Sequence, residues 1–434
     1  MQRSVLAVAV AAAFAANAHA EPTVVNGPMA FNPIPASAYQ QGGIDLATAP
    51  WVIPSDYTQT IVSDESDLDI YVGVDWNDMN TVNESKSHAG RFLYRTHEVR
   101  TGNDARNDGG LGGSVSVVDL QTGEAKEVAT RYDWEALDGI VWTPWHTILF
   151  AEETITSARP DPDHPAAVSG LVYELALDPA DPTRAASVTV RPQLGALSHE
   201  GLELDAAGNV YVIDEERTGA IYKFVPETRG DLSSGQLYAL KVASPTKTGV
   251  GEWVELDMDQ VQISARVAAK AAGATSYCRP EDIERIASTL YVALTCEDVG
   301  DPTSTSGPGA VMAISLGGTP SVSYVVAAGR NAPVENRGAG VTGFRGVDNL
   351  ADGPDGRLWM VEDNAYSDIW VFDPNSTDGD GDGYRDGVYL FASLKDVGAE
   401  GTGIYFGTDP QTLFVNVQHS DTGNDKTMAI TRRK

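Results

Sequence analysis

Carboxylate side chains recur at the beginnings of short predicted strands, each shortly before a repeated strand pattern. These residues are Asp138, Glu200, Glu281, Asp282, Asp348 and Glu400. If the strands lie at equivalent places around one centre, their carboxylates converge and resist ionisation, because like charges repel. A multivalent cation removes that penalty, and such hard oxygen ligands suit Ca²⁺, Mg²⁺, Mn²⁺ or Fe³⁺. The pattern predicts a metal centre, although any one of these residues could instead serve a turn.

Three histidines near these positions, His97, His199 and His419, could add nitrogen ligands or could be ordinary core residues. The sequence contains no Gly-x-Ser-x-Gly nucleophile turn, no P-loop and no GxGxxG before a helix. Ser198, His199 and Glu200 have the residue types of a catalytic triad, but neighbours on a strand point to opposite faces. The acidic residues therefore remain the main candidates for chemistry.

A separate acidic segment alternates aspartate with glycine. Its aspartates are Asp378, Asp380, Asp382 and Asp386. This alternation is typical of a loop that wraps oxygen atoms around Ca²⁺. Position 12 of an EF-hand loop would be Tyr389 rather than glutamate, so the segment is no complete EF-hand. We expect a structural calcium loop here, with a plain acidic turn as the alternative.

The elements that must position these residues repeat six times. Each unit has a turn, an apolar-alternating strand, a mostly acidic cluster and a second strand. The first strands are predicted at 90–94, 147–150, 208–212, 288–292, 356–360 and 411–415. Short alternating strands with glycine-rich turns predict an all-β fold, and six similar units predict a six-bladed β-propeller. A β-sandwich or two unrelated β domains are the alternatives. One helical insertion is expected over Asp259–Ala272, ending at Gly273.

The beginning of the chain predicts export. Residues 1–20 read as a signal peptide, with Arg3, the apolar run Leu6–Ala16 and a small-residue cleavage site at Ala18–Ala20. A membrane anchor is the alternative, but this run is short for a bilayer core of about 30 Å, and no later span is visible. Residues 21–60 are expected to form an outer arm, and residues 61–434 a single propeller domain. The mature protein is expected to be periplasmic or secreted.

Composition narrows the function classes further. The 434 residues include 61 Asp and Glu against 30 Lys and Arg, a formal net charge of −31. Such a chain repels nucleic-acid phosphates, which excludes a nucleic-acid binder. Cys278 and Cys296 would lie in an oxidising compartment, where they could pair or remain two buried thiols.

Several motifs, in order, resemble the PhoX family of exported alkaline phosphatases. The segments that carry the resemblance are Thr143–Thr147, Ala151–Glu153, Ser198–Gly201, Arg279–Ile283, Asp348–Leu350 and Phe414–His419. The likeness runs from about residue 90 to the end. It implies a six-bladed propeller, an iron–calcium cluster of Ca²⁺ and Fe³⁺ at its centre, and hydrolysis of small phosphate monoesters. We expect a monomer.

The resemblance also implies residue roles. The implied metal ligands are Glu98, Asp138, Glu152, Glu200, Glu281 and Asp348, with Asp282 and Glu400 as additional ones. Arg279 would hold the substrate phosphate, or could form a structural ion pair with Glu281 or Asp282. Thr147, Asn349 and Asn416 are candidates for hydrogen bonds to the phosphate.

Two departures from the family pattern leave other functions open. Asp138 stands where the family has a metal-bridging cysteine, and His146 stands where it has glycine. An aspartate favours an all-oxygen site, which puts the iron in question. A calcium-dependent propeller lactonase or esterase is one alternative. A non-catalytic, exported calcium-binding propeller is the other.

Overall fold

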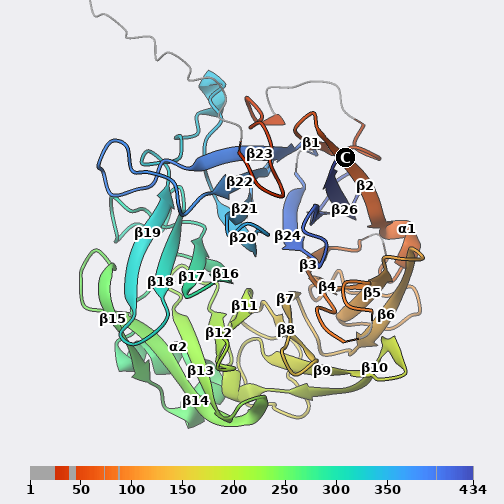
Figure 1. Ribbon diagram of the computed structural model, residues 1–434. Coiled ribbons are helices and arrows are strands. Elements are labelled where there is room, and N and C mark those ends of the chain that lie inside the picture. Colours follow the sequence, from red (N-terminus) through yellow and green to blue (C-terminus); the bar gives the residue numbers. More distant parts are fainter. Residues whose placement is uncertain (1–24, 39–44, 73, 87, 397, 434) are drawn as a thin grey trace, which may run out of the picture.

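Antiparallel sheets surround a common centre in the computed structural model (Figure 1). It describes residues 25–38, 45–72, 74–86, 88–396 and 398–433, so the predicted signal peptide lies outside the described residues. Two of the sheets each consist of four strands that follow one another directly in the sequence. They are β3 (Asn77–Val82), β4 (Phe92–His97), β5 (Ser114–Asp119) and β6 (Glu124–Thr130), then β7 (Leu137–Trp142), β8 (Ile148–Glu152), β9 (Val172–Asp178) and β10 (Asp181–Val190).

The largest sheet has nine strands and consists of two four-stranded runs joined through β15 (Gly249–Glu255). The first run is β11 (Leu202–Leu204), β12 (Val210–Ile213), β13 (Ile221–Thr228) and β14 (Asp231–Val242). The second is β16 (Pro280–Ile286), β17 (Thr289–Leu294), β18 (Ala310–Ser315) and β19 (Ser321–Ala327). Only Gly249 and Val250 of β15 pair with β19, so the junction between the runs is narrow.

Two further sheets recruit strands from near the beginning of the chain. One contains β20 (Val347–Asp352), β21 (Leu358–Glu362), β22 (Asp368–Phe372), β23 (Val388–Leu394) and β1 (Trp51–Val52). The other contains β24 (Glu400–Phe406), β25 (Thr412–Gln418), β26 (Lys426–Arg432) and β2 (Tyr57–Asp64). Since β2 pairs with β26, the early and late parts of the chain are joined in one sheet.

The strands at one edge of each run contact one another in a closed cycle. Neighbouring strands in this cycle are β3, β7, β11, β16, β20, β24 and again β3. We call these the inner strands. The apolar core lies between adjacent sheets, where residues such as Trp134, Phe150 and Tyr173 pack their rings together. Apolar packing between the sheets thus holds them in place around the centre, and the inner strand of each run lies nearest to that centre. The all-β prediction is confirmed.

The described part of the predicted outer arm packs against the sheet of β20–β23. The Phe31 ring lies 5.0 Å from that of Phe391 at an interplanar angle of 84°, an edge-to-face contact. The Tyr57 hydroxyl donates a hydrogen bond of 3.1 Å to the carbonyl of Ala30. β2 begins at Tyr57, so the last sheet extends a few residues into the range expected for the arm.

The helical insertion is α2, which spans Met258–Ala272 and ends at Gly273 as the sequence predicts. Gly273 adopts a positive φ of 73°, a conformation that favours glycine at a helix end. The buried residues Val261, Ala265 and Ala268 pack α2 against the sheet that contains β14. The short helix α1 spans Glu65–Leu68. Among the described residues, no helix has the length and apolar character needed to cross a membrane.

Candidate metal centre

A cavity of about 290 Å³ lies at the centre of the ring, where the inner strands begin. We call it the acidic cavity. Each inner strand, or the segment within two residues before it, contributes a carboxylate to its wall. These residues are Asp78, Asp138, Glu200, Glu281, Asp348 and Glu400. The convergence expected from the sequence is therefore present for Asp138, Glu200, Glu281, Asp348 and Glu400, and Asp78 completes the set.

An irregularity in strand pairing accompanies the acidic residue at the start of four inner strands, β3, β7, β16 and β20. The pairing register shifts between Asn77 and Asn80 in β3, and between Leu137 and Ile140 in β7. The same shift occurs at the beginnings of β16 and β20. In each case the acidic residue directly follows the first residue of the irregularity. Such bulges bend a strand and redirect a side chain, here toward the centre.

Glycines after two of the acidic residues let neighbouring inner strands approach closely. A Cβ atom on Gly139 would lie 1.7 Å from the carbonyl oxygen of Glu200. A Cβ atom on Gly201 would lie 2.6 Å from the backbone nitrogen of Ile283. The acid–glycine pair within β7 and the one just before β11 thus combine an inward carboxylate with close backbone packing.

Residues at the ends of the second strands form a further layer of the wall. They are Glu98 after β4, Glu153 after β8, Asp363 after β21 and His419 after β25. The His419 Nε2 atom lies 3.0 Å from an oxygen of Glu98 and 3.0 Å from an oxygen of Glu400. These ion pairs outweigh the effect of burial and raise the pKa of His419 to about 11, so the imidazole is a cation at neutral pH.

The converging carboxyl groups resist ionisation. Burial, followed by repulsion from neighbours such as Asp78, raises the pKa of Asp138 well above its ordinary value. Burial and the charge of Glu281 act in the same direction on Glu200 and on Asp348 and raise the pKa of each. Burial also raises the pKa of Asp78 to about 7. The cavity gathers more negative charge than its own cations balance.

Carboxylate oxygens in the acidic cavity fit a hard multivalent cation. Asp138 Oδ1 and Glu200 Oε2 are buried and have no hydrogen-bond partner among the described residues. An oxygen from each of Glu200, Glu281 and Asp348 lies within 4.8 Å of the others, and Glu98, Glu400 and His419 form a second such group. Buried charges without partners are costly, and coordination to Ca²⁺ or Fe³⁺ would satisfy them.

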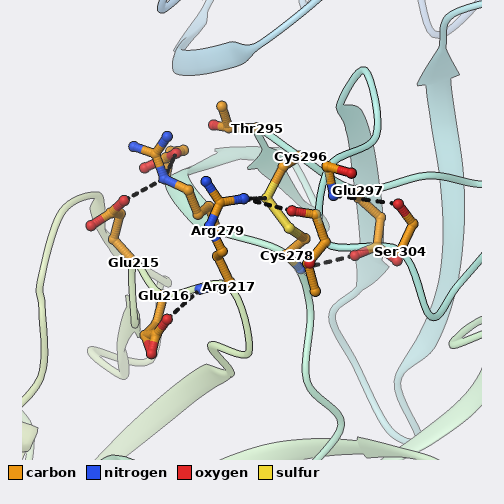
Figure 2. Close-up of a disulfide and its surroundings, with 12 residues drawn as sticks. Glu215, Glu216, Arg217, Cys278, Arg279, Thr295, Cys296, Glu297 and Ser304 are labelled. Atoms are coloured by element: carbon orange, nitrogen blue, oxygen red, sulfur yellow. Dashed lines mark hydrogen bonds and ion pairs between the residues drawn. A yellow bond between two sulfur atoms is a disulfide. The ribbon is translucent and has the colours of Figure 1, made fainter.

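Arg279 enters the cavity wall from the beginning of the β16–β17 hairpin. Its Nε atom lies 2.5 Å from an oxygen of Glu215 and 3.0 Å from an oxygen of Glu281. The predicted ion pair with Glu281 is thus present, and Glu215 rather than Asp282 is the second partner. Cys278, directly before Arg279, forms a disulfide with Cys296, which fixes the hairpin at this point (Figure 2).

Two predicted ligands point away from the acidic cavity because their sequence neighbours occupy it. Glu152 accepts hydrogen bonds from the backbone of Glu135 and Leu171 and from the Tyr173 hydroxyl, at 3.0 to 3.2 Å. Asp282 accepts bonds of 2.7 Å from the backbone nitrogens of Ile283 and Leu350. Both carboxylates therefore join neighbouring segments of the fold.

Three residues suggested for phosphate binding also lie outside the acidic cavity. The Thr147 hydroxyl donates to Glu174 at 2.7 Å, in the turn at the opposite end of β7, where His146 also lies. The Asn349 side-chain oxygen accepts a 2.7 Å bond from the Gly403 nitrogen. The Asn416 side chain donates to the Asp78 carbonyl and accepts a 2.8 Å bond from Thr427. These groups join strands to one another.

Two other histidines named from the sequence have partners within the fold. His97 Nδ1 lies 3.1 Å from Asp75, and His199 Nε2 lies 2.8 Å from the carbonyl of Gly195.

The acidic segment at 378–386 forms an exposed loop. Oxygens of Asp378, Asp380 and Asp382 lie within 4.8 Å of one another. Asp378 also accepts hydrogen bonds from the loop nitrogens of Gly381 and Gly383, at 2.7 and 3.0 Å. Asp386 accepts a 2.8 Å bond from the nitrogen of Gly379 and lies outside the group of three. Calcium binding by this loop stays a prediction.

The structure adds residues that sequence reasoning missed. Besides Asp78 these are Glu153, Asp363 and Arg100, of which Arg100 lies 2.5 Å from both Glu98 and Glu153. A signal for Asp78 was present, since Asn77–Asn80 precedes the first repeat just as the other inner strands precede theirs. Strand alternation could have indicated that Glu152 and Glu153 face opposite ways.

Comparisons with known proteins show similarity in sequence to one family and similarity in fold to solved structures. The family described as alkaline phosphatase PhoX matches residues 138–421. A Pseudomonas fluorescens PhoX structure, in complex with the transition-state analogue vanadate, superposes with a TM-score of 0.65 at 19% identity, covering 94% of this chain and 98% of that chain. A Bacteroides thetaiotaomicron protein of unknown function gives a TM-score of 0.47 at 9% identity, covering 86% and 76%.

A search of curated protein sequences returns no match. The family match nevertheless spans more than half of the 434 residues and includes Asp138, Glu200, Arg279, Glu281 and Asp348. The resemblance noted in the sequence is confirmed, and the chain belongs to the alkaline phosphatase PhoX family, whose members are phosphoric ester hydrolases.

Proposed function

We propose that this protein is an exported, metal-dependent alkaline phosphatase that hydrolyses phosphate monoesters in the acidic cavity. The observation that carries the proposal is the convergence of six carboxylates, each from the beginning of an inner strand or within two residues before it, beside the guanidinium of Arg279. Family membership supports the reaction. The disulfide between Cys278 and Cys296 supports a final location in an oxidising compartment, the periplasm or the exterior.

The proposed architecture is a six-bladed propeller over residues 61–434 with an outer arm at 21–60. The closed cycle of inner strands supports this architecture, because each inner strand begins one run of four strands. A propeller brings equivalent positions of successive blades to one axis. That geometry would explain why carboxylates far apart in the sequence share one cavity.

The proposed metal ligands are the carboxylates that line the acidic cavity. They are Asp78, Glu98, Asp138, Glu153, Glu200, Glu281, Asp348, Asp363 and Glu400. This all-oxygen set suits Ca²⁺ and also Fe³⁺, and Asp138 in place of a cysteine shifts the preference toward hard ions. When bound, such ions would neutralise the phosphate and lower the pKa of a coordinated oxygen nucleophile.

Arg279 is the group of the chain best placed to bind the phosphate of the substrate. Its guanidinium is a planar fork that suits two phosphate oxygens, and its side chain is 31% exposed at the cavity. When the substrate binds, Arg279 would exchange its contact with Glu215 or Glu281 for contacts with the phosphoryl group that is transferred. The positive charges of Arg100 and His419 hold Glu98 in its charged form, which keeps a ligand ready at the opposite wall.

The test uses purified mature protein and measures metal content and p-nitrophenyl phosphate turnover on the same sample. We expect bound metal, loss of turnover after EDTA, and recovery with Ca²⁺. Arg279→Gln should lower kcat/KM by roughly 100-fold, since it removes a charge-assisted contact to the transferring group. The matched control is Arg184→Gln, an exposed residue of β10, which should behave as wild type.

Metal-loaded protein that hydrolyses no phosphate ester would contradict the proposal. Activity on lactones would then identify a calcium-dependent lactonase or esterase. Calcium-dependent stability without any hydrolysis would identify a non-catalytic calcium-binding propeller.

A further inference from the structure

A second cavity, of about 420 Å³, adjoins the acidic cavity and has the opposite charge. We call it the arginine cavity. Among the described residues that line it, four are arginines, namely Arg217, Arg279, Arg337 and Arg345, and one, Asp363, is acidic. The chain as a whole has a formal net charge of −31. Four guanidinium groups around one cavity are unusual in so acidic a protein, and they indicate that the cavity binds an anion.

Hydrogen bonds within the fold hold the far wall of the arginine cavity. Glu362 accepts bonds from the backbone nitrogen of Arg345 at 2.8 Å and from the Asn364 amide at 3.0 Å. Arg337 donates to the Asn364 side chain and lies 3.0 Å from Glu335. This network fixes the segments on which the arginines sit.

The guanidinium of Arg345 remains accessible. Its side chain is 64% exposed, and its ion pair with Glu335 spans 3.7 Å. Glu335 also serves Arg337, so one carboxylate is shared by two guanidinium groups. Arg345, which lines the arginine cavity, therefore offers an exposed guanidinium group.

Arg217 faces the same cavity from the other side. It donates a bond of 2.5 Å to the carbonyl of Thr305, and its Nη1 atom lies 3.9 Å from the sulfur of Cys296. In the part of the chain that the structure describes, no carboxylate lies within ion-pair distance of Arg217. Figure 2 shows Arg217 and Arg279 together beside the disulfide.

The two cavities share part of their walls. Arg279 and Asp363 line both of them. A phosphate held by Arg279 in the acidic cavity would therefore lie next to the arginine cavity. The remainder of the same substrate molecule could extend into it.

We propose that the arginine cavity binds a second anionic group, a carboxylate or a phosphate, on the leaving group of the substrate. This inference rests on the proposed phosphatase function and names a substrate class for it. Guanidinium groups bind carboxylate and phosphate through paired, charge-assisted hydrogen bonds. Preferred substrates are thus phosphate monoesters with a second anion close to the ester, rather than esters of neutral alcohols.

The kinetic test compares 4-carboxyphenyl phosphate with phenyl phosphate. We expect wild-type kcat/KM to favour the carboxylated ester, chiefly through KM. Arg345→Gln and Arg217→Gln should each reduce that preference about tenfold, the effect of one lost hydrogen bond to a charged group. Arg184→Gln, on the outer strand β10, should keep the wild-type preference. An unchanged preference in both cavity variants would overturn the inference.

A binding test separates this inference from the proposed function, because it needs no turnover. Isothermal titration compares methylphosphonate, which has one anionic group, with phosphonoacetate and methylenediphosphonate. Tighter binding of either probe with two anionic groups, reduced about tenfold by Arg345→Gln, supports the arginine cavity even if p-nitrophenyl phosphate is not hydrolysed. If phosphonoacetate binds more tightly, the second anion is a carboxylate, and if methylenediphosphonate binds more tightly, it is a phosphate. Equal affinity for all three probes would reject the proposal. It would not affect the proposed phosphatase function, which the turnover of p-nitrophenyl phosphate tests separately.

Discussion

At the scale of single residues, the direction of a carboxylate decides its role. Glu152 and Glu153 are neighbours, yet Glu153 lines the acidic cavity and Glu152 accepts hydrogen bonds from three groups of the fold. Glu281 and Asp282 divide their roles in the same way. Residue type and spacing locate such pairs. Strand alternation separates Glu152 from Glu153, whereas a shift in strand register accompanies the separation of Glu281 from Asp282.

The Glu152 and Glu153 pair allows a matched experiment. Glu153→Ala should lower metal affinity about 10- to 100-fold, while the EDTA-treated protein stays as stable as wild type because a repelling charge is removed. Glu152→Ala should keep the metal but reduce the free energy of unfolding by about 1–3 kcal/mol, since buried donors lose their acceptor. Elemental analysis and thermal unfolding measure both effects. Equal metal loss in the two variants would contradict the assignment.

Asp138 lines the acidic cavity, and its Oδ1 atom has no hydrogen-bond partner among the described residues. Asp138→Asn should reduce bound metal and turnover by at least about tenfold, because a buried ligand oxygen loses its charge. Asp138→Cys should raise the iron-to-calcium ratio, since a thiolate is a softer ligand. Metal analysis after loading with both ions checks the ratio. Asp282→Asn is the control, as this residue lies outside the acidic cavity and should leave the ratio unchanged.

At the scale of elements, the β16–β17 hairpin carries the group proposed to bind phosphate. Arg279 adopts a positive φ of 44°, a conformation that non-glycine residues rarely hold without support. The disulfide from Cys278 to Cys296 and the bond from the Cys278 nitrogen to Glu297 at 2.9 Å give that support. The hairpin thus holds Arg279 at the boundary between the two cavities.

Removal of the disulfide should affect both stability and substrate binding. The Cys278→Ser, Cys296→Ser double variant should lose about 2–4 kcal/mol of unfolding free energy, as expected for a short loop. We expect KM for p-nitrophenyl phosphate to rise several-fold, with a smaller change in kcat, because Arg279 is less well positioned. Thermal unfolding and steady-state kinetics measure the two effects. An unchanged KM in a destabilised variant would show that the disulfide serves stability alone.

Much of the element-level organisation is readable from sequence. Gly90–Tyr94 and the five similar stretches correspond to β4, β8, β12, β17, β21 and β25, and α2 lies within one residue of its predicted start. The acidic cavity was also predictable, since five of its six inner-strand carboxylates were identified. The roles of Thr147 and Asn416 could not be read in this way, because they depend on contacts with Glu174 and Asp78. Likewise, the arginine cavity combines four residues that have no common motif.

At the scale of the whole molecule, clustered acids at the centre make stability depend on pH. Burial raises the pKa of Asp78 and of Glu281 to about 7 each. The folded state therefore binds more protons than the unfolded state above about pH 4, and folding stability falls as pH rises through 7. His419, with its pKa raised to about 11, acts in the same direction at higher pH.

We expect the melting temperature of EDTA-treated protein to decrease from pH 5 to pH 8, and Ca²⁺ to abolish most of that decrease. Differential scanning fluorimetry at constant ionic strength makes the measurement. Mg²⁺ at equal concentration controls for general screening, because it dehydrates reluctantly and is a poor fit to an all-protein set of ligands. A melting temperature that rises over this pH range without metal would contradict the raised pKa values.

The pairing of β2 with β26 has a consequence for the order of assembly. Asp78 and His419 line one cavity, although they stand near opposite ends of the chain. A chain in which the strand carrying Asp78 and the strand ending before His419 have not both formed therefore lacks part of the wall of the acidic cavity. If the acidic cavity binds metal as proposed, capture would have to follow the pairing of β26 with β2, and the ions available where that pairing takes place would determine which metal is bound.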